Sequence, residues 1–285
     1  MPNSHSHKTV LVTSCSSGIG LAVALGLQKR GYHVIASARK KQDVYRLRDL
    51  GMETLQLDLN DSMSIQTAVK SLYQLTNGKI YALFNNGAYG QPGAVEDLKR
   101  EVVRAQFETN VFGTLELTNM IIPMMRQQGH GRIIQNSSVL GLVALAYRGA
   151  YVASKYALEG LTDTLRMELH GTNIYPILIE PGPIESRFRA NAYAAFKQNI
   201  NTERSVHQAA YVAQEARMNK EGAAQPFTLP AEAVLKKVIQ ALESPRPKIR
   251  YYVTFPTYLF AVLKRLLSHR AMDKIMRKVS GEGKN

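Results

Sequence analysis

Residues 8–20 read Lys8-Thr9-Val10-Leu11-Val12-Thr13-Ser14-Cys15-Ser16-Ser17-Gly18-Ile19-Gly20, and this stretch predicts the fold of the chain. Its first half is a short apolar run rich in β-branched residues, which is typical of a buried strand. A turn of serine and glycine follows, and the apolar residues after it favour a helix. A strand, a Gly/Ser turn and a helix form the phosphate cradle of a dinucleotide-binding unit, because N–H groups at the helix start face the pyrophosphate. A plain strand-to-helix turn is the alternative, since Gly and Ser are common in both.

An alternation of strands and helices continues along the chain. Further strands are expected at residues 32–37, 53–57, 80–85, 132–137, 174–180 and 249–253, and helices at residues 43–50, 63–75, 100–127 and 149–169. This order predicts an α/β fold, a Rossmann-like, doubly wound parallel sheet of about seven strands with helices on both faces.

A single domain over residues 1–285 is expected, because the sequence has no repeat, no low-complexity segment and no convincing boundary. Residues 8–182 would form the cofactor-binding and catalytic core. Residues 183–230 are polar, helical in pattern and dotted with aromatic residues, and they follow the sixth strand. We expect them to form a helical substrate lid at the carboxyl edge of the sheet, where ligands bind in such folds. A surface helical insertion is the alternative. Residues 246–280 form a basic and apolar C-terminal extension.

The composition is that of a folded protein, with 285 residues, 45% of them apolar and 20% charged. The single cysteine, Cys15, excludes an internal disulfide and fits a reducing compartment, so we expect a cytoplasmic protein. Residues 1–7 have no apolar core and are expected to be a flexible tail rather than a signal peptide. We expect no metal site.

Much of the net charge of +14 lies near the C-terminus. Residues 246–278 carry a net charge of +8, because they hold one acid, Asp273, and nine basic residues: Arg246, Lys248, Arg250, Lys264, Arg265, Arg270, Lys274, Arg277 and Lys278. This asymmetry suggests an anionic partner surface, either a membrane or a nucleic acid. We expect no nucleic acid, because the basic residues lie beside a lipophilic run and no recognition motif is apparent.

That lipophilic run is residues 251–263, a stretch of 13 residues without a charge. As a helix it would span roughly 20 Å, short of the ~30 Å hydrocarbon thickness of a bilayer, and Pro256 interrupts it. It is therefore not a convincing transmembrane span. Three interpretations stay open: a peripheral contact with a membrane interface that collects lipophilic substrate, a helix that covers the pocket, and a dimer interface.

A tyrosine and a lysine four residues apart, Tyr151 and Lys155, suggest proton transfer. Residues at this spacing lie on one face of a helix. An ammonium held beside a phenol favours the phenolate, so the tyrosine could exchange a proton far below its free pKa of roughly 10. Most such pairs are ordinary helix surface, but here Ser138 lies 13 residues upstream.

These features occur with others in an order and at a spacing that resemble the short-chain dehydrogenases/reductases. The shared motifs are Thr13-x-x-x-x-Gly18-Ile19-Gly20, Asn85-Asn86-Gly87-Ala88, Asn110, Ser138, Tyr151-x-x-x-Lys155 and Pro181-Gly182. The match covers about residues 8–190, and the C-terminal part is similar to the branch of steroid and retinol dehydrogenases and bacterial NADP-dependent aldehyde reductases. Each motif is weak alone, and together they are specific.

The chain departs from the family's pattern at two places. The family usually has glycine where this chain has Ser14, and Asn-Asn-Ala-Gly where this chain has Asn85-Asn86-Gly87-Ala88. If the first position requires a positive φ, serine there costs on the order of 1 kcal/mol or more. The exchanged pair keeps both residues small, so the cofactor can still approach closely.

The resemblance implies a catalytic set of Asn110, Ser138, Tyr151 and Lys155. Tyr151 would donate the proton in reduction and accept it, as phenolate, in oxidation. Lys155 would lower the pKa of Tyr151 and hold the nicotinamide ribose. Ser138 would hydrogen-bond the substrate oxygen. Asn110 would hold a helix irregularity and a water that relays protons to Lys155.

The resemblance also implies a nicotinamide cofactor. Asp58 would accept a hydrogen bond from the adenine amino group, Asn85 would face the riboses, and Ser186 would lie near the carboxamide. The full expected cofactor set is Thr13, Ser16, Ser17, Gly18, Ile19, Gly20, Arg39, Lys40, Asp58, Leu59, Asn85, Gly87, Tyr151, Lys155, Pro181, Gly182, Ile184 and Ser186.

The loop after the second strand favours NADP(H) over NAD(H). An acid about 20 residues after the glycines would hydrogen-bond the ribose 2′-OH of NAD. Here the loop reads Ala36-Ser37-Ala38-Arg39-Lys40, with no acid before Asp43. An arginine can clamp a 2′-phosphate, so we expect Arg39 as the main contact and Ser16 and Lys40 as helpers. A solvated basic loop is the alternative.

The expected function is an NADP(H)-dependent oxidoreductase that transfers hydride between the nicotinamide and an apolar carbonyl or alcohol. The apolar residues 139–147 flank the substrate in this fold, so Leu140 and Leu145 are expected to contact it with Ser138 and Tyr151. A packed loop without substrate information explains them nearly as well. A homodimer or homotetramer would suit the family. A non-catalytic NADP-binding sensor or scaffold is the alternative function, although a scaffold has no chemical need for Tyr151 and Lys155 together.

Overall fold

The protein is described by a computed structural model of residues 8–219, 222 and 226–281. The tail expected at residues 1–7, and residues 220–221 and 223–225 of the expected lid, lie outside the described residues.

Seven parallel strands form one sheet in the order β3-β2-β1-β4-β5-β6-β7, which confirms the doubly wound sheet that the sequence predicts. The strands are β1 (Thr9–Val12), β2 (His33–Ala38), β3 (Glu53–Gln56), β4 (Ala82–Asn85), β5 (Gly131–Asn136), β6 (Ile174–Glu180) and β7 (Arg250–Tyr252). The strand order reverses its direction between β1 and β4. In open sheets of this kind, a ligand binds outside the carboxyl ends of the strands at that point.

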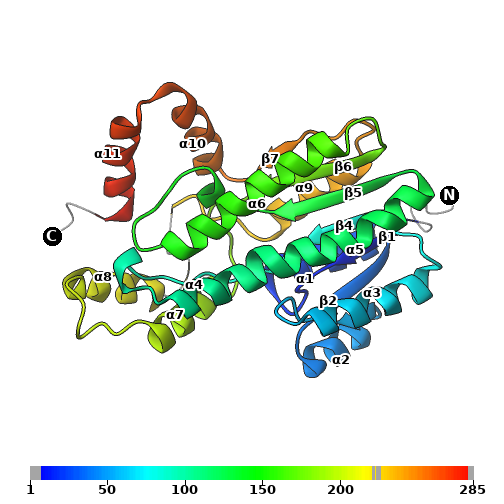
Figure 1. Ribbon diagram of the computed structural model, residues 1–285, viewed down its shortest axis with the longest axis horizontal. Coiled ribbons are helices and arrows are strands. Elements are labelled where there is room, and N and C mark those ends of the chain that lie inside the picture. The colour runs from blue at the N-terminus through cyan, green and yellow to red at the C-terminus, as the bar shows by residue number, and fades with distance from the viewer. Residues whose placement is uncertain (1–7, 220–221, 223–225, 282–285) are drawn as a thin grey trace.

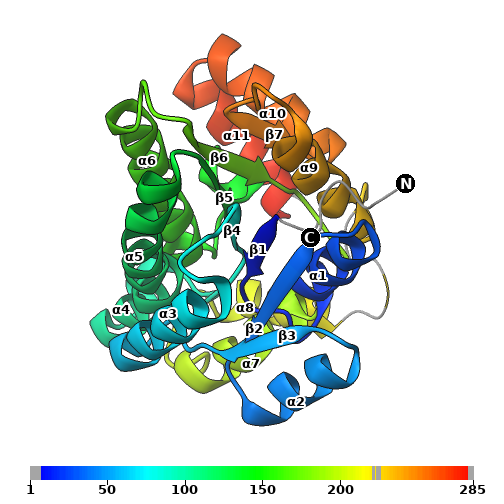
Figure 2. The same cartoon turned by 90° about the vertical axis from the view of Figure 1, so that its right-hand side faces the viewer.

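Helices cover both faces of the sheet (Figures 1 and 2). One face is packed by α1 (Gly18–Lys29), α2 (Lys41–Asp49) and α9 (Glu232–Glu243). The other face is packed by α3 (Ser62–Thr76), α5 (Gly113–Gln128) and the end of α6 (Gly149–Glu168). Because both faces are covered, the strands are almost continuously buried, which is why they read as apolar runs in the sequence.

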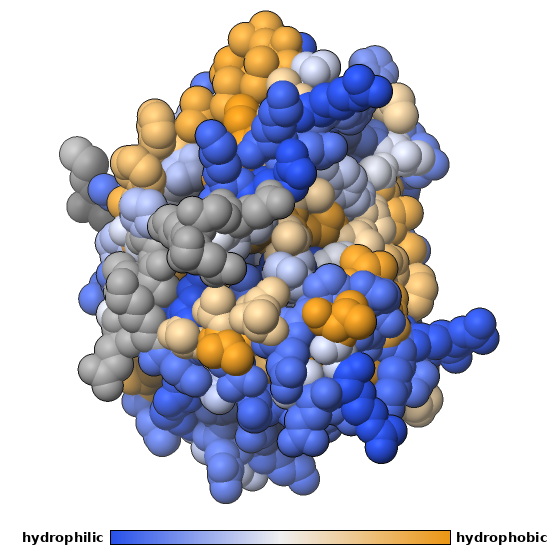
Figure 3. Space-filling model, turned by 90° about the vertical axis from the view of Figure 1, so that its left-hand side faces the viewer, coloured by the Kyte–Doolittle hydropathy of each residue, from blue (hydrophilic) through white to orange (hydrophobic). Residues whose placement is uncertain are grey.

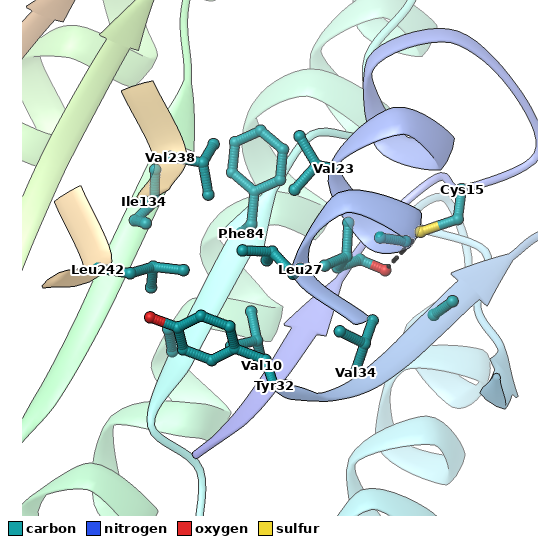
Figure 4. Packing of buried hydrophobic residues seen from close by; sticks show 14 of the residues in the cluster. Val10, Cys15, Val23, Leu27, Tyr32, Val34, Phe84, Ile134, Val238 and Leu242 are labelled. Atoms are coloured by element: carbon teal, nitrogen blue, oxygen red, sulfur yellow. Dashed lines mark hydrogen bonds between the residues drawn. The ribbon is translucent and has the colours of Figure 1, made fainter. Parts of the chain in front are cut away.

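The core between the sheet and α1 is densely packed (Figure 4). Phe84 of β4 has no exposed surface and belongs to one cluster with Val23 of α1 and Val238 of α9. Cys15 is also buried in this cluster, where its thiol donates to the Val12 carbonyl oxygen at 3.1 Å. Burial raises the pKa of Cys15 to about 12. Its thiol therefore stays protonated, and the side chain packs in the core as a small apolar residue.

Two lid helices, α7 (Phe188–Asn199) and α8 (Gln208–Asn219), lie beyond the carboxyl edge of the sheet (Figure 1). Tyr211 of α8 is buried, and its hydroxyl accepts a hydrogen bond from Ala94 N at 3.0 Å and donates to the Asp97 carboxylate. The lid is therefore attached to the loop that follows β4.

The C-terminal extension forms β7, α10 (Phe255–Leu266) and α11 (His269–Ser280). The expected interruption near Pro256 is confirmed, because the helix α10 begins only at Phe255, and Pro256 lies in its first turn and helps to begin it. The lipophilic run is thus divided between a strand and a helix. Within the described residues, no helix is both long and apolar enough to cross a bilayer.

The expected helix at residues 100–127 is three consecutive pieces. It begins as α4 (Arg100–Phe107), passes through a π-helical turn (Glu108–Phe112), and continues as α5. The ends of the other expected elements shift by a few residues at most, as in β2, where the strand ends at Ala38.

Candidate active site

Three of the expected catalytic residues come together at the carboxyl edge of the sheet. Tyr151 and Lys155 lie on the buried face of α6 and are 8% and 2% exposed. Ser138 follows β5 and begins a 3-10 turn. The Ser138 hydroxyl accepts a hydrogen bond from Leu140 N at 3.1 Å and is also hydrogen-bonded to Tyr151. The i, i+4 spacing places Tyr151 and Lys155 on the same face of α6, and the end of β5 places Ser138 beside them.

The structure does not show the lowered Tyr151 pKa that the sequence predicts. Burial raises the pKa of Tyr151 to about 12, and the hydrogen bond with Ser138 opposes this only in part. The Lys155 ammonium lies 5.7 Å from the centre of the Tyr151 ring, and it donates to the Asn136 carbonyl oxygen at 2.7 Å. The neutral phenol is therefore the stable form, and this is the form that a proton donor in reduction requires.

Lys155 is a buried cation whose charge depends on its neighbours. Burial lowers the pKa of Lys155 to about 8, and the carboxylate of Glu159, one helical turn further along α6, opposes the shift. Without Glu159, the ammonium would be still less stable in this environment.

Asn110 lies inside the π-helical turn, so the helix irregularity that the sequence predicts is confirmed. Its amide donates to Tyr89 O at 3.1 Å and to Ser154 Oγ at 3.0 Å, and it accepts from Tyr89 N at 3.2 Å. Ser154 is next to Lys155 on α6, so Asn110 joins the π turn to the catalytic helix. The water that would relay protons to Lys155 stays a prediction.

The turn after β1 has the shape of an anion cradle. A Cβ added at Gly20 would lie 2.3 Å from the Ser14 carbonyl oxygen, so only glycine lets α1 begin this close to the strand end. The first turn of α1 contains no acid, and its N-cap residue, Ser17, makes no side-chain cap hydrogen bond. These uncapped N–H groups fit the pyrophosphate of a nicotinamide cofactor.

Ser14 adopts the left-handed backbone that favours glycine, with φ 56°, as does Gly18 with φ 55°. The condition for a cost of about 1 kcal/mol at Ser14 is therefore met. The turn forms despite this strain.

Thr13 ties this turn to the turn after β4. Its buried hydroxyl accepts hydrogen bonds from Asn86 N at 2.8 Å and from Gly87 N at 3.1 Å. The Asn85 amide donates to Thr118 Oγ1 of α5 at 2.9 Å. Its contact with the riboses stays a prediction.

The expected 2′-phosphate contacts lie after β2. Arg39 and Lys40 are both exposed, and the Arg39 carbonyl accepts a hydrogen bond from Gln56 Nε2 at 3.0 Å. The nearest downstream acid, Asp43, is paired with Arg46 at 3.0 Å. Arg46 also donates to the Ser16 carbonyl oxygen, so it joins this loop to the phosphate cradle.

The adenine end of the expected site lies after β3. The Asp58 carboxylate accepts a hydrogen bond from Asn60 N at 3.0 Å, and Leu59 is buried beside it. One Asp58 oxygen is thus used by its own turn, as is common for aspartate in loops.

The segment after β6 lies against the phosphate cradle. A Cβ added at Gly18 would lie 2.9 Å from Ser186 Cβ, and one added at Gly182 would lie 2.2 Å from Thr254 Oγ1. The Pro181 carbonyl accepts a hydrogen bond from Val139 N at 2.8 Å, and Ile184 pairs with Leu229 of the lid segment. The structure therefore brings these expected cofactor residues beside both the cradle and the loop after Ser138.

The expected substrate residues Leu140 and Leu145 are covered by the C-terminal extension. They pack against a cluster that contains Val143, Phe260 of α10 and Met276 of α11. This placement supports the interpretation of the extension as a cover over the loop after Ser138.

Sequence reasoning counted Phe188, which begins α7, among the aromatic residues of the expected lid but missed its contact with Tyr151. Its ring lies 5.2 Å from the Tyr151 ring, measured between centres, in an edge-to-face arrangement. A Cβ at Gly90 would approach Phe188 Cζ to 2.7 Å, so the glycine makes room for this ring. No motif places a lid aromatic against Tyr151, and only the tertiary fold reveals the contact.

Sequence reasoning also missed an acid cluster behind Lys155. Arg250 of β7 donates to Glu180 at 2.7 Å, to Asp163 at 2.5 Å, and to Glu159. Glu180 is fully buried, and burial together with the charge of Glu159 raises the pKa of Glu180 to about 8. The available signal was the spacing of Tyr151, Lys155, Glu159 and Asp163, which repeats every four residues along α6.

Comparison with protein families gives one assignment. The family model described as short chain dehydrogenase matches residues 8–197, which is more than half of the chain.

Individual relatives extend over nearly the whole length. The chain is 43% identical over 270 residues to YbbO, an uncharacterized oxidoreductase of Escherichia coli K12, covering 95% of this chain and 94% of YbbO. It is 32% identical to human 17-beta-hydroxysteroid dehydrogenase type 1, covering 86% and 77%. It is 30% identical to an NADPH-dependent 3-dehydrocapnine reductase of Ornithobacterium rhinotracheale, covering 94% and 95%. The sequence similarity therefore includes the C-terminal extension as well as the motif-bearing core.

Proposed function

This chain belongs to the short-chain dehydrogenase family, and from that premise we propose that it is an NADP(H)-dependent oxidoreductase. It interconverts an apolar carbonyl compound and the corresponding alcohol, with Tyr151 as the proton donor and acceptor. The observation that supports this most directly is the buried group formed by Tyr151, Ser138 and Lys155 at the carboxyl edge of the sheet.

The bound nicotinamide supplies or accepts the hydride. Each chain residue then has a separate task. The Ser138 hydroxyl is hydrogen-bonded to Tyr151. Both hydroxyl groups are therefore placed to donate a hydrogen bond to the carbonyl oxygen of the substrate. Tyr151 donates its proton to that oxygen as negative charge develops there. Lys155 supplies positive charge beside the phenolate that is left, and Asn110 holds the neighbouring Ser154 in position.

The preference for NADP(H) is proposed from the charge around the 2′ position. Arg39 and Lys40 are exposed there, and the nearest downstream acid, Asp43, is already paired with Arg46. A 2′-phosphate would meet positive charge without repulsion. The relative that is named as NADPH-dependent is similar to this chain over 94% of its length.

The proposed substrate class is an apolar aldehyde, ketone or alcohol, such as a retinoid or a steroid. The loop 139–147 is almost entirely apolar, and Phe188 adds an aromatic ring at Tyr151. One relative is named as a hydroxysteroid dehydrogenase.

The experiment that tests this function compares NADPH and NADH oxidation on a panel of apolar aldehydes and ketosteroids. Turnover should require NADPH and fall at least ~10³-fold in Tyr151→Phe, because the proton donor is removed. Arg39→Ala should weaken NADPH and leave NADH unchanged, which separates the 2′-phosphate contact from the rest of the site. A wild-type preference for NADH would contradict the role of Arg39.

The alternative is a non-catalytic NADP-binding sensor or scaffold. Ser14 and the basic extension are the features that favour it. Tight NADPH binding without turnover across the panel, and with no effect of Tyr151→Phe, would support the sensor.

We also propose that the protein is cytoplasmic, forms a homodimer or homotetramer, and contacts an anionic membrane peripherally through α10 and α11. Five apolar residues at helical spacing face outward on α10 and are between 39% and 74% exposed: Phe255, Tyr258, Leu259, Val262 and Leu266. We call them the apolar stripe. Hydrophobic and hydrophilic side chains lie next to each other at the top of this side of the molecule (Figure 3).

An anionic bilayer fits this surface better than a second copy does, because the stripe is bordered by positive charge. Lys264 and Arg265 end α10, and Arg270, Lys274, Arg277 and Lys278 are exposed on α11. Two copies meeting at the stripe would bring these like charges together, whereas phosphate head groups would neutralise them. The opposite face of α10 packs on the substrate loop, so a lipophilic substrate would arrive close to the site.

Co-sedimentation with vesicles tests the contact. The protein should bind vesicles with about 30% phosphatidylserine, release at high salt, and bind neutral phosphatidylcholine only weakly. Leu266→Glu should abolish binding, whereas Met63→Glu, at a similarly exposed position on α3, should not. Loss of a dimer in Leu266→Glu, with no vesicle binding by the wild type, would assign the stripe to a second copy and overturn the membrane proposal.

A further inference from the structure

The two places where this chain departs from its family's pattern lie against each other in the fold. A Cβ added at Gly87 would lie 2.9 Å from the Ser14 hydroxyl oxygen and 2.5 Å from Leu59 Cδ1. Ordinary contacts between such atoms are about 3.5–4.0 Å. A side chain at residue 87 would therefore be wedged between Ser14 and Leu59.

The backbone around these residues gives little room for relief. The Thr13 hydroxyl accepts hydrogen bonds from both Asn86 N and Gly87 N, and Asn86 Nδ2 donates to the Thr13 carbonyl at 3.2 Å. These bonds hold the turn after β1 and the turn after β4 at a fixed separation. The left-handed backbone of Ser14, φ 56°, fixes the direction in which its Cβ leaves the chain.

We propose that Ser14 and Gly87 are a coupled pair, in which glycine at residue 87 provides the space that the Ser14 side chain occupies, and that Ser14 is a wall residue of the cofactor site. A chain with glycine at residue 14 lacks the hydroxyl that a Cβ at residue 87 would meet, so only the Leu59 methyl group would have to shift to admit alanine there. A chain with serine at residue 14 needs glycine there, with the methyl group moved to Ala88. The glycine at residue 87 thus compensates for the serine at residue 14, and the two departures from the family's pattern depend on each other.

Ser14 is placed to affect the cofactor because of its other contact. Its carbonyl oxygen is the atom that prevents any side chain at Gly20, in the first turn of α1. If a side chain at residue 87 displaced Ser14, the start of α1 would shift with it, and the N–H groups there are the ones that would face the pyrophosphate. This part of the inference rests on the proposed cofactor function, whereas the packing of the pair does not.

A double-mutant cycle tests the coupling, with wild type, Ser14→Ala, Gly87→Ala and the double variant. Ser14→Ala removes the hydroxyl and keeps the Cβ that sets the backbone conformation. Two quantities are measured in each protein: the thermal midpoint without any cofactor, and the dissociation constant of NADPH by fluorescence. In the wild-type background, Gly87→Ala should lower the midpoint by several degrees and weaken NADPH about tenfold; in the Ser14→Ala background, both effects should fall by more than half.

Gly90→Ala is the matched control, because Gly90 lies in the same loop but its added Cβ would meet Phe188 instead. Its effect on the thermal midpoint should be the same with Ser14 and with alanine at residue 14. The proposal is overturned if Gly87→Ala costs as much in the Ser14→Ala background as in the wild type, or if it costs nothing in the wild type.

The experiment still decides the proposal if Gly87→Ala fails to fold or if the protein does not bind NADPH. If Gly87→Ala does not accumulate as folded protein, recovery of the folded double variant supports the pair, and failure of the double variant overturns it. If no variant binds NADPH, the proposed function fails, while the thermal cycle without cofactor still decides whether Ser14 and Gly87 are coupled.

Discussion

The core of residues 8–182 and the outward face of α10 hold their apolar residues in opposite ways. In the core, Phe84 has no exposed surface, and the strands around it are buried on both faces. On α10, Phe255 is 57% exposed at one end of the apolar stripe. The core therefore fixes one backbone arrangement, whereas the apolar stripe is the surface that we propose to contact a membrane.

The two regions also differ in whether their charged residues are buried or exposed. Acids in the core, such as Glu180, are buried against Arg250 and hold the catalytic helix. Charges on α10 and α11 lie at the surface. The difference teaches that the proposed chemistry depends on charges held in fixed ion pairs, whereas the proposed membrane contact depends on charges exposed at the surface.

The largest effect should come from exchanging one phenylalanine in each part for alanine. Phe84→Ala should lower the free energy of unfolding by about 3–5 kcal/mol, because it leaves a cavity between the sheet and α1. Phe255→Ala should lower it by less than about 1 kcal/mol, since it loses mainly an exposed contact with Phe227, at a ring distance of 5.1 Å. Urea unfolding of both variants measures the two values, and equal losses would break the comparison.

A smaller effect should separate two asparagines. Asn110→Ala removes three hydrogen bonds of a residue that is 1% exposed, and it should cost about 2–3 kcal/mol of unfolding free energy. Asn199→Ala in the lid removes one bond, from Asn199 Nδ2 to Gln91 Oε1 at 2.7 Å, and should cost about 1 kcal/mol. Thermal unfolding compares them. Turnover should fall in Asn110→Ala and change little in Asn199→Ala, and the reverse order would place the proton path in the lid.

Glu180 should make the stability of the core depend on pH. Its pKa in the folded protein is raised from 4.5 to about 8, so the folded state keeps this proton longer than the unfolded state does. The stability that this proton provides is present in full below about pH 4.5 and is lost as the pH rises to about 8. Glu180→Gln lacks this loss, and its thermal midpoint relative to wild type should rise by a few degrees between pH 5 and pH 8.5.

Asp97, which attaches the lid, should show the opposite sign. Hydrogen bonds from Ser205 and Tyr211 hold the pKa of Asp97 below its ordinary value of 3.8. Its contribution is present above that value and is lost as the pH falls through the lowered pKa. Asp97→Asn should therefore have a slightly lower midpoint than wild type at pH 7, and the difference should shrink as the pH falls below 3.8. A difference that does not depend on pH would remove the contrast with Glu180.

Sequence reasoning predicted the sheet, its seven strands and the grouping of Ser138, Tyr151 and Lys155. It succeeded because strands buried on both faces appear as apolar runs, and because the catalytic spacing follows from helix geometry. It also placed an irregularity at Asn110, where the π turn lies.

The rest depends on contacts between distant segments. The pKa of Tyr151 is set by burial, which cannot be judged from a lysine four residues away. Phe188 reaches Tyr151 only through the folded lid, and Gly87 meets Ser14 across 73 residues of sequence. The interruption at Pro256 was predicted, but the sequence did not show that proline would lie in the first turn of a helix that begins there.

Arg250 is synthesised after all three of the acids with which it pairs. Its three acidic partners lie on α6 and β6, which leave the ribosome well before β7 does. Until residue 250 has emerged, the nascent chain holds Glu159, Asp163 and Glu180 without the cation that makes their burial stable. The ion pairs between the proposed catalytic helix and β7 can therefore form only near the end of translation, so they are among the last contacts of the fold to be made.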